Sequence, residues 1–203
     1  MDRSYRLCLI ITRSMCALQP ERTIEEAVAG GVDMIQVREK DCSSAELLAW
    51  SQKVVALGER LQVPVIINDS VEVAMASQAT GVHLGQDDMS IADARQLLGK
   101  NKLIGLSTHD LEQLDDAALA GADYVGFGPI FPTATKGYTQ GIGVEQLTGA
   151  VVMSSLPMLA IGGITVDNAW MLPGKAGIAV SSAICSSQEP GKIAHSLCSS
   201  TLY

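Results

Sequence analysis

The most constraining feature of this sequence is a regular alternation of short apolar runs with longer amphipathic stretches. Eight runs have the length and composition of buried strands, and they cover residues 7–12, 34–38, 63–68, 81–84, 103–107, 124–128, 158–162 and 178–182. Eight helical patterns alternate with them, at residues 23–29, 44–61, 71–78, 91–98, 110–120, 144–153, 165–172 and 190–197. Strands with near-continuous apolar residues are buried on both faces, which is typical of a parallel sheet covered by helices.

This order predicts an α/β fold, a single (β/α)8 TIM barrel that occupies residues 1–203 as one domain. An open doubly wound sheet is the alternative, because 203 residues is close to the smallest length for such a barrel. That alternative would carry a G-x-G-x-x-G motif after the first strand, and the motif is absent there. The clearest helix is 44–61, with Ser44 as its expected N-cap. In a TIM barrel the active site lies at the carboxyl ends of the strands, so polar residues there are the candidates.

Composition narrows the range of partners. The formal net charge of −8 argues against a general nucleic-acid surface, which needs a basic face, but it leaves room for small anionic ligands. Five cysteines form no C-x-x-C pair, which indicates a reducing compartment. The longest early apolar run, residues 7–11, is too short to span a membrane. We therefore expect a cytoplasmic protein that binds small molecules and neither nucleic acid nor membrane; a homo-oligomer is left open.

Three polar residues follow one another at a spacing of two along the second strand and beyond it. Gln36, Arg38 and Lys40 project to the same side of an extended chain. If that side faces the barrel interior, two cations enter a confined space that accepts them only with anionic partners. The alternative is that the strand ends at Val37 and that these charges are solvated.

Carboxylates follow the third and fourth strands. Asn68 and Asp69 end the third strand, and Asp87 and Asp88 follow the fourth. Two carboxylates at the tops of neighbouring strands can share a Mg2+ ion whose other ligands are phosphate and water. Alone, such residues also serve as turn formers or helix caps. His83 lies within the fourth strand and is interpreted as a hydrogen-bonded core residue, and no spacing of cysteine and histidine indicates zinc.

The last three strands end in small and hydroxyl-bearing residues. After the sixth strand, Thr133, Thr135 and Lys136 suit phosphate oxygens, although an ordinary polar loop has the same composition. The seventh strand ends in G-G (162–163) and the eighth in S-S (181–182). Backbone amides at such positions bind phosphate, and a tight turn and an N-cap are the alternatives. The loops after strands seven and eight are the recurrent phosphate site of this fold.

These residues together predict two anion sites on one rim. The site near strands seven and eight suits a phosphate monoester. The other site has Arg38, Lys40, Lys136 and two carboxylates, which suits a diphosphate with Mg2+. The segment S-T-H (107–109) has the residue types of a nucleophile–base pair but lacks a G-x-S-x-G context. A reaction that proceeds through stabilisation of a departing diphosphate needs no such pair.

Seven segments of the chain resemble thiamine phosphate synthase. They occur in order from the second strand to the eighth and read QVREK (36–40), IND (67–69), GVHLGQDD (81–88), GLSTH (105–109), DYVGFGPIFPTATK (123–136), AIGGI (160–164) and VSSAI (180–184). Each segment alone is a weak signal, but seven in register are specific. The resemblance implies a TIM-barrel transferase that joins 4-amino-2-methyl-5-hydroxymethylpyrimidine diphosphate to 4-methyl-5-(2-phosphoethyl)thiazole, giving thiamine phosphate and diphosphate.

The resemblance also implies a role for each matching residue. Mg2+ would be held by Asp69 and Asp88, with Asp87 as an acidic neighbour. The pyrimidine diphosphate would be bound by Gln36, Val37, Arg38, Glu39, Lys40, Asn68, Ser107 and Lys136. The thiazole phosphate would be bound by Thr133, Ala134, Thr135, Gly163, Ser181 and Ser182. Arg38, Ser107 and Lys136 would act in catalysis, and Ser107 would orient the pyrimidine diphosphate rather than act as a nucleophile.

Some features depart from the family pattern, and other functions share the fold. Arg13 stands where many relatives carry an acidic residue, the connection 168–177 is shorter than usual, and Pro173 is expected to end its helix early. A thiazole tautomerase-like relative is the nearest alternative, but such relatives lose the N-D, Q-x-D and T-x-T-K features present here. A catalytically silent phosphate-binding barrel and an indole-glycerol-phosphate or phosphoribosyl isomerase type of enzyme are the others.

Overall fold

Eight parallel strands close into a barrel in the computed structural model, which describes residues 5–133 and 139–200. The strands are β1 (Leu7–Ile11), β2 (Met34–Val37), β3 (Val65–Asn68), β4 (Gly81–Leu84), β5 (Leu103–Thr108), β6 (Tyr124–Phe127), β7 (Met158–Ile161) and β8 (Gly177–Val180). They are hydrogen-bonded in chain order, and β8 pairs with β1, where Ala179 is in register with Cys8. The predicted TIM barrel is therefore confirmed, and the open-sheet alternative is wrong.

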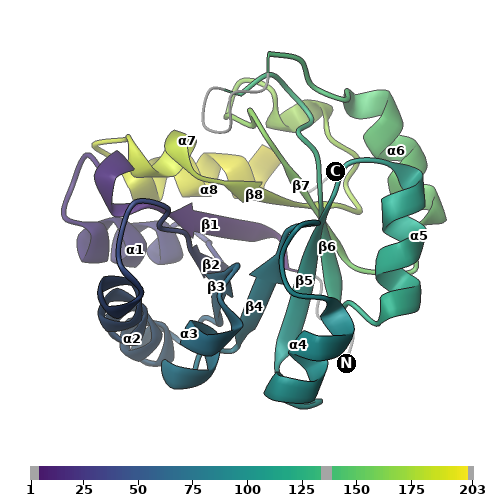
Figure 1. The fold of residues 1–203 in the computed structure, drawn as a ribbon. Coiled ribbons are helices and arrows are strands. Elements are labelled where there is room, and N and C mark those ends of the chain that lie inside the picture. Colours follow the sequence, from purple (N-terminus) through teal and green to yellow (C-terminus); the bar gives the residue numbers. More distant parts are fainter. Residues whose placement is uncertain (1–4, 134–138, 201–203) are drawn as a thin grey trace.

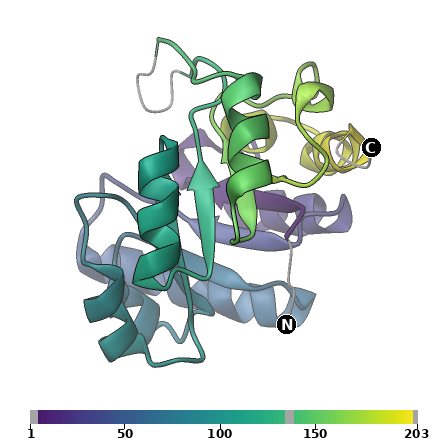
Figure 2. The same ribbon diagram turned by 90° about the vertical axis from the view of Figure 1, so that its right-hand side faces the viewer.

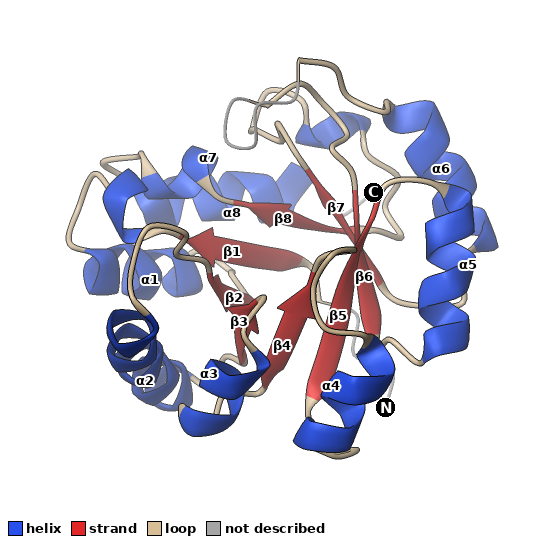
Figure 3. Cartoon of the chain, viewed as in Figure 1, coloured by secondary structure: helices blue, strands red, loops and turns tan. Residues whose placement is uncertain are grey.

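The helices surround the strands (Figure 1). They are α1 (Pro20–Ala29), α2 (Ser44–Leu61), α3 (Val71–Ala76), α4 (Ile91–Leu98), α5 (Leu111–Ala120), α6 (Val144–Met153), α7 (Ser182–Cys185) and α8 (Pro190–Ser200), with the 3-10 helices η1 (Arg13–Met15) and η3 (Ala169–Met171). Figure 2 shows α5 and α6 covering the same flank of the barrel, and Figure 3 shows the strands enclosed at the centre. Within residues 5–133 and 139–200, no helix combines the length and apolar character that crossing a membrane requires.

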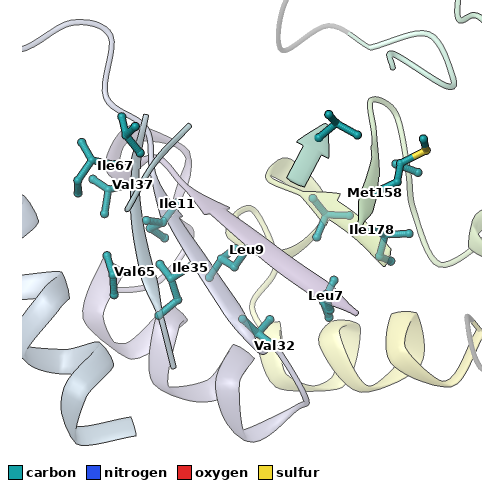
Figure 4. Packing of buried hydrophobic residues seen from close by; sticks show 14 of the residues in the cluster. Leu7, Leu9, Ile11, Val32, Ile35, Val37, Val65, Ile67, Met158 and Ile178 are labelled. Atoms are coloured by element: carbon teal, nitrogen blue, oxygen red, sulfur yellow. The ribbon is translucent and has the colours of Figure 1, made fainter. Parts of the chain in front are cut away.

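Apolar side chains form two separate layers, because successive strand residues face opposite sides of a sheet. The inner layer fills the barrel and contains Cys8, Ile10, Met34, Ile66, Tyr124, Leu159 and Ala179. The outer layer lies between strands and helices, and Figure 4 shows part of it, including Leu9, Ile35 and Val37. Gln36 is in register with Ile10 on one side and Ile66 on the other, so it belongs to the inner face. This alternation decides which residues at the strand ends reach the interior.

Short polar side chains begin several of the helices. The predicted helix 44–61 has the correct bounds, but its N-cap is Ser43 and not Ser44. Ser43 accepts a hydrogen bond from the Glu46 backbone N–H, and the Glu46 carboxylate accepts from the Ser43 backbone N–H at 2.9 Å. This reciprocal pair is a capping box, which the sequence S-S-A-E allows at only one of its two serines. Asp110, predicted as the first residue of its helix, likewise is the N-cap of α5.

The predicted helix 165–172 is wrong, because the segment forms only the 3-10 helix η3. The Asn168 side chain accepts from the Thr165 backbone N–H at 2.8 Å and donates to the Gly163 carbonyl at 2.9 Å. These bonds hold a single turn, in which the Ala169 backbone N–H donates to the Thr165 carbonyl at 3.0 Å, and the segment does not continue as an α-helix. Leu172 is extended before Pro173, as expected for a residue that precedes proline. The eighth strand is also shorter than predicted, since it ends at Val180 and the next residues begin the short helix α7.

Candidate active site

A pocket lies at the carboxyl ends of the strands and is lined by residues from both halves of the chain. Of the residues proposed from sequence, it brings together Arg38, Ser107, Thr133, Gly163, Ser181 and Ser182. Closure of β8 onto β1 makes this possible, because it sets the last loops beside the first ones. Thr165 also lines the pocket and was missed by sequence reasoning. Its signal was weak, since one threonine after A-I-G-G-I looks like the start of the next helix.

Of the three residues spaced by two along β2 and beyond it, Arg38 lines the pocket, whereas Gln36 and Lys40 are not among its lining residues. Gln36 is buried on the inner face, and Arg38 lines the pocket. The Arg38 backbone N–H donates to the Ile11 carbonyl at 3.0 Å, and Thr12 Oγ1 donates to the Arg38 carbonyl at 2.7 Å. The strand does end at Val37, as the alternative interpretation held, yet these bonds continue the pairing with the β1 loop by one residue.

Two residues proposed to bind substrate turn their side chains away from the pocket. Val37 is fully buried in the outer layer against the helices. Glu39 forms an ion pair with Arg13, in which Arg13 Nε lies 3.1 Å from Glu39 Oε1. Neither side chain is directed toward the groups that line the pocket. The sequence segment 36–40 therefore contributes alternate residues to the site and to the structure that supports it.

The two proposed metal ligands follow neighbouring strands, and the Asp69 backbone N–H donates to the carbonyl of His83 on β4 at 2.8 Å. The Asp88 carboxylate accepts from the Gly85 backbone N–H at 2.7 Å, and its carboxyl group interacts with that of Asp69. Partial burial raises the pKa of Asp88 because it disfavours the charged carboxylate, and the Asp69 carboxylate raises this pKa further because it disfavours a second negative charge nearby. The Lys40 ammonium forms an ion pair with Asp69. Asp69 also has φ of 65°, a left-handed conformation that is uncommon for a residue with a side chain.

These carboxylates fit a magnesium ion by the chemistry of their donors. Asp69 and Asp88 supply oxygen ligands, the type that Mg2+ prefers, and a shared cation would relieve the repulsion that contributes to the raised pKa of Asp88. In the described part of the chain, no three histidine, cysteine, aspartate or glutamate residues gather as a metal cluster. A site with two carboxylates agrees with the usual coordination of Mg2+, in which one or two protein carboxylates bind the ion and phosphate and water oxygens fill the other positions.

Ser107 is held by a hydrogen-bond network inside the barrel. His83 Nε2 lies 3.0 Å from Ser107 Oγ, and His83 Nδ1 lies 3.1 Å from the Tyr124 hydroxyl. His83 is buried, so its interpretation as a hydrogen-bonded core histidine is confirmed. A Cβ atom on Gly105 would come within 2.6 Å of His83 Nδ1, so this strand needs a residue without a side chain there. Burial raises the pKa of Tyr124 well above its usual value, which keeps its hydroxyl neutral.

The opposite side of the pocket is built from backbone and small side chains. Gly163 has φ of 65°, and a Cβ atom there would lie 2.4 Å from the Pro132 carbonyl oxygen. Asn168 fixes the Gly163 carbonyl, as described above. Ser181 precedes α7 and its hydroxyl contacts Met15 Sδ at 3.8 Å, while Ser182 is the first residue of that helix. This turn and the serine pair line the same pocket, as the sequence predicts.

Four predicted site residues remain, and the structure describes only one of them. Asn68 is the last residue of β3 and is in register with His83, next to Asp69. Ala134, Thr135 and Lys136 lie outside the described residues, so their proposed roles stay predictions from sequence. With its pocket in the loops that follow the strands, the molecule falls in the class of TIM-barrel enzymes.

Comparisons with known proteins define the class more closely. A family model described as thiamine monophosphate synthase matches residues 7–184. The chain is 43% identical over 199 residues to the thiamine-phosphate synthase of Vibrio parahaemolyticus, covering 97% of this chain and 98% of that protein. It is 39% identical over 188 residues to that of Clostridium acetobutylicum, covering 91% and 89%. The protein belongs to the thiamine-phosphate synthase family, whose members are transferases.

Solved structures agree with this assignment. A thiamine phosphate pyrophosphorylase from Pyrococcus furiosus superposes with a TM-score of 0.88 at 32% identity, covering 98% of this chain and 96% of that chain. A 3-hexulose-6-phosphate synthase superposes with a TM-score of 0.68 at 16% identity, covering 96% and 99%. At that identity the second likeness is one of fold alone.

Proposed function

We propose that this protein condenses 4-amino-2-methyl-5-hydroxymethylpyrimidine diphosphate with 4-methyl-5-(2-phosphoethyl)thiazole, releasing diphosphate and forming thiamine phosphate. The observation that carries the proposal is the composition of the pocket rim. Arg38, Gly163 and the serine pair 181–182 line the pocket, while Asp69 and Asp88 follow β3 and β4 at the same end of the barrel. One reaction that needs both a diphosphate site and a phosphate monoester site accounts for the two kinds of surface.

The β2–β4 side would bind the pyrimidine diphosphate. Arg38 offers a planar set of donors for phosphate oxygens, and Lys40 adds a compact charge beside Asp69. Mg2+ held by Asp69 and Asp88 would supply charge neutralisation for the diphosphate group. Ser107, whose hydroxyl is fixed by His83, would orient the pyrimidine. Gln36 and Asn68 would complete this side, and Lys136, which lies outside the described residues, is proposed to join them.

The β6–β8 side would bind the thiazole phosphate. The turn at Gly162 and Gly163 has φ of 101° and 65°, and its backbone amides would bind the phosphate. Ser181, Ser182 and Thr133 add hydroxyl donors around the same pocket. No lysine or arginine is needed for a single monoester when backbone and hydroxyl donors converge on it.

The reaction follows from what these residues stabilise. The bond between the pyrimidine methylene carbon and the diphosphate oxygen breaks, and its electron pair leaves with the diphosphate. The positive charges of Arg38 and Lys40 would stabilise the departing diphosphate. The aminopyrimidine would donate electron density to the methylene cation. The thiazole nitrogen then uses its lone pair to form the new carbon–nitrogen bond. This nitrogen carries no proton, so the site needs no general base.

A two-substrate assay tests the proposal directly. Purified protein with Mg2+ and both substrates is expected to release diphosphate and form thiamine phosphate in a one-to-one ratio. Omission of the thiazole phosphate should abolish product and leave only slow diphosphate release. Equal diphosphate release with and without the thiazole phosphate would instead describe a hydrolase, and the absence of either product would reject the function.

A further inference from the structure

Arg13 connects the loops that follow β1 and β2, beyond the last pair of hydrogen-bonded strand residues. The strand register ends at Ile11 and Val37. Past this point the Arg13 backbone N–H donates to Glu39 Oε1 at 2.9 Å, and Arg13 Nε donates to the same oxygen at 3.1 Å. One carboxylate oxygen therefore joins the two loops that follow β1 and β2.

The Arg13–Glu39 pair is partly shielded from water. The Glu39 side chain is only 8% exposed, whereas that of Arg13 is 38% exposed. The Arg13 guanidinium carbon lies 5.5 Å from the ring centroid of Trp50, which is buried on α2. A carboxylate at such a depth is costly without a partner, because water cannot solvate it and screens its charge poorly. Arg13 supplies that partner, and Trp50 gives the guanidinium a fixed surface to rest on.

Glu39 separates the two cations of the proposed diphosphate site in sequence. Arg38 lines the pocket and Lys40 pairs with Asp69, while Glu39 is paired with Arg13. Glu39 lies between Arg38 and Lys40 in the chain, so holding its side chain in place restricts the backbone that carries both cations. An unpaired Glu39 carboxylate would also attract these neighbouring cations and compete with a bound diphosphate for them.

We infer that Arg13 is a positioning residue, which through Glu39 keeps Arg38 and Lys40 directed toward the diphosphate of the substrate. The inference rests on the proposed function, because it assigns Arg13 to the binding of that diphosphate. Arg13 acts through Glu39, so the effect of its loss falls on one substrate rather than on both.

Steady-state kinetics of Arg13→Ala test this role. The variant is expected to raise KM for the pyrimidine diphosphate about tenfold, since misplacement of a binding group by a fraction of an ångström weakens its contacts. KM for the thiazole phosphate should stay at the wild-type value. The double variant Arg13→Ala/Glu39→Gln should recover most of the loss, because the amide leaves no uncompensated charge beside the cations. Arg13→Lys should recover part of it, because lysine keeps the charge but not the planar stacking on Trp50.

Arg6 offers a matched control at the other end of the same two strands. It pairs with Asp33, with Arg6 Nε 3.8 Å from Asp33 Oδ2, far along β1 and β2 from the pocket. Arg6→Ala should lower the melting temperature without changing either KM. An Arg13→Ala variant that lost stability but kept the wild-type KM for the pyrimidine diphosphate would overturn the inference. So would an equal rise in both KM values.

Calorimetric titration with inorganic diphosphate and Mg2+ separates this inference from the proposed function. Weaker diphosphate binding by Arg13→Ala than by Arg6→Ala, about tenfold in Kd, would support the positioning role even if the wild type formed no thiamine phosphate. Equal Kd values in the two variants would reject the role even if the wild type were fully active. If Arg13→Ala does not fold, Arg13→Lys and the double variant carry the same comparison.

Discussion

The two sides of the barrel rim, at the carboxyl ends of the strands, are built on different physical principles. The charged side, Arg38, Lys40, Asp69 and Asp88, relies on side chains that neutralise one another, as in the Lys40–Asp69 ion pair. The backbone side, Gly163, Ser181 and Ser182, relies on conformation and on close packing of the chain. A charged side can lose function through one missing charge while the fold stays intact. A backbone side changes only when the backbone moves. Mutations that weaken substrate binding there should therefore also lower the free energy of unfolding.

The largest expected effect comes from removing one carboxylate of the charged side. Asp88→Asn should lower kcat/KM about a hundredfold or more, because it removes a proposed ligand to the ion that neutralises the diphosphate. Titration of activity with Mg2+ should show a weaker and shallower response. Asp87→Asn is the matched control, since it removes the same charge one residue away and should change the Mg2+ response little. An unaltered Mg2+ response in Asp88→Asn would remove this residue from the metal site.

A methyl group on the backbone side should produce a smaller and different effect. Gly163→Ala places a Cβ atom 2.4 Å from the Pro132 carbonyl oxygen at φ of 65°. We expect it to lower the free energy of unfolding by about 1–3 kcal/mol and to raise KM for the thiazole phosphate several-fold. Urea unfolding and steady-state kinetics measure the two effects. Gly121→Ala has a comparable φ of 88° with no atom within 4 Å of the new Cβ, so it should destabilise the fold without changing either KM.

The smallest expected effect concerns two half-buried cysteines. A hydrogen bond with Cys185 lowers the pKa of Cys16, whereas burial raises the pKa of Cys198. A lower pKa means more thiolate at a given pH, and the thiolate is the reactive form. Cys16 should therefore react with iodoacetamide at lower pH than Cys198, as peptide mass spectrometry across a pH series can follow. Cys185→Ala should move the reactivity of Cys16 to higher pH, and an unchanged profile would contradict the assignment.

Labelling at Cys16 also sharpens the comparison of the two sides. Cys16 follows η1, and the Ala17 backbone N–H donates to the Cys185 carbonyl at 2.8 Å at the end of α7. A group attached to Cys16 should therefore press on the helix that carries Ser182. We expect KM for the thiazole phosphate to rise after labelling, with a smaller change for the pyrimidine diphosphate.

Sequence reasoning succeeded where strand geometry alone sets the outcome. The barrel follows from eight apolar runs, and the inward direction of Gln36 and Arg38 follows from a spacing of two. Side-chain contacts beyond the ends of strands depend on partners that are distant in the sequence. The ion pair of Glu39 with Arg13 could therefore not be predicted from the segment 36–40 alone. The backbone preference of a residue before proline explains the wrong helix at 165–172, because Leu172 is extended before Pro173 and the segment stops after one turn.

Closure of the barrel between its first and last strands has a consequence for the order in which the protein is made. Ile10, near the start of the chain, and Ser181, near its end, line the same pocket, and β8 is the last strand to leave the ribosome. In a nascent chain, the pocket residues from β1 and β2 are therefore synthesised well before those from β8. Substrate binding at this pocket can stabilise the fold only after β8 has been made. In the cell, substrate would therefore protect full-length molecules against unfolding, but not chains that are still being translated.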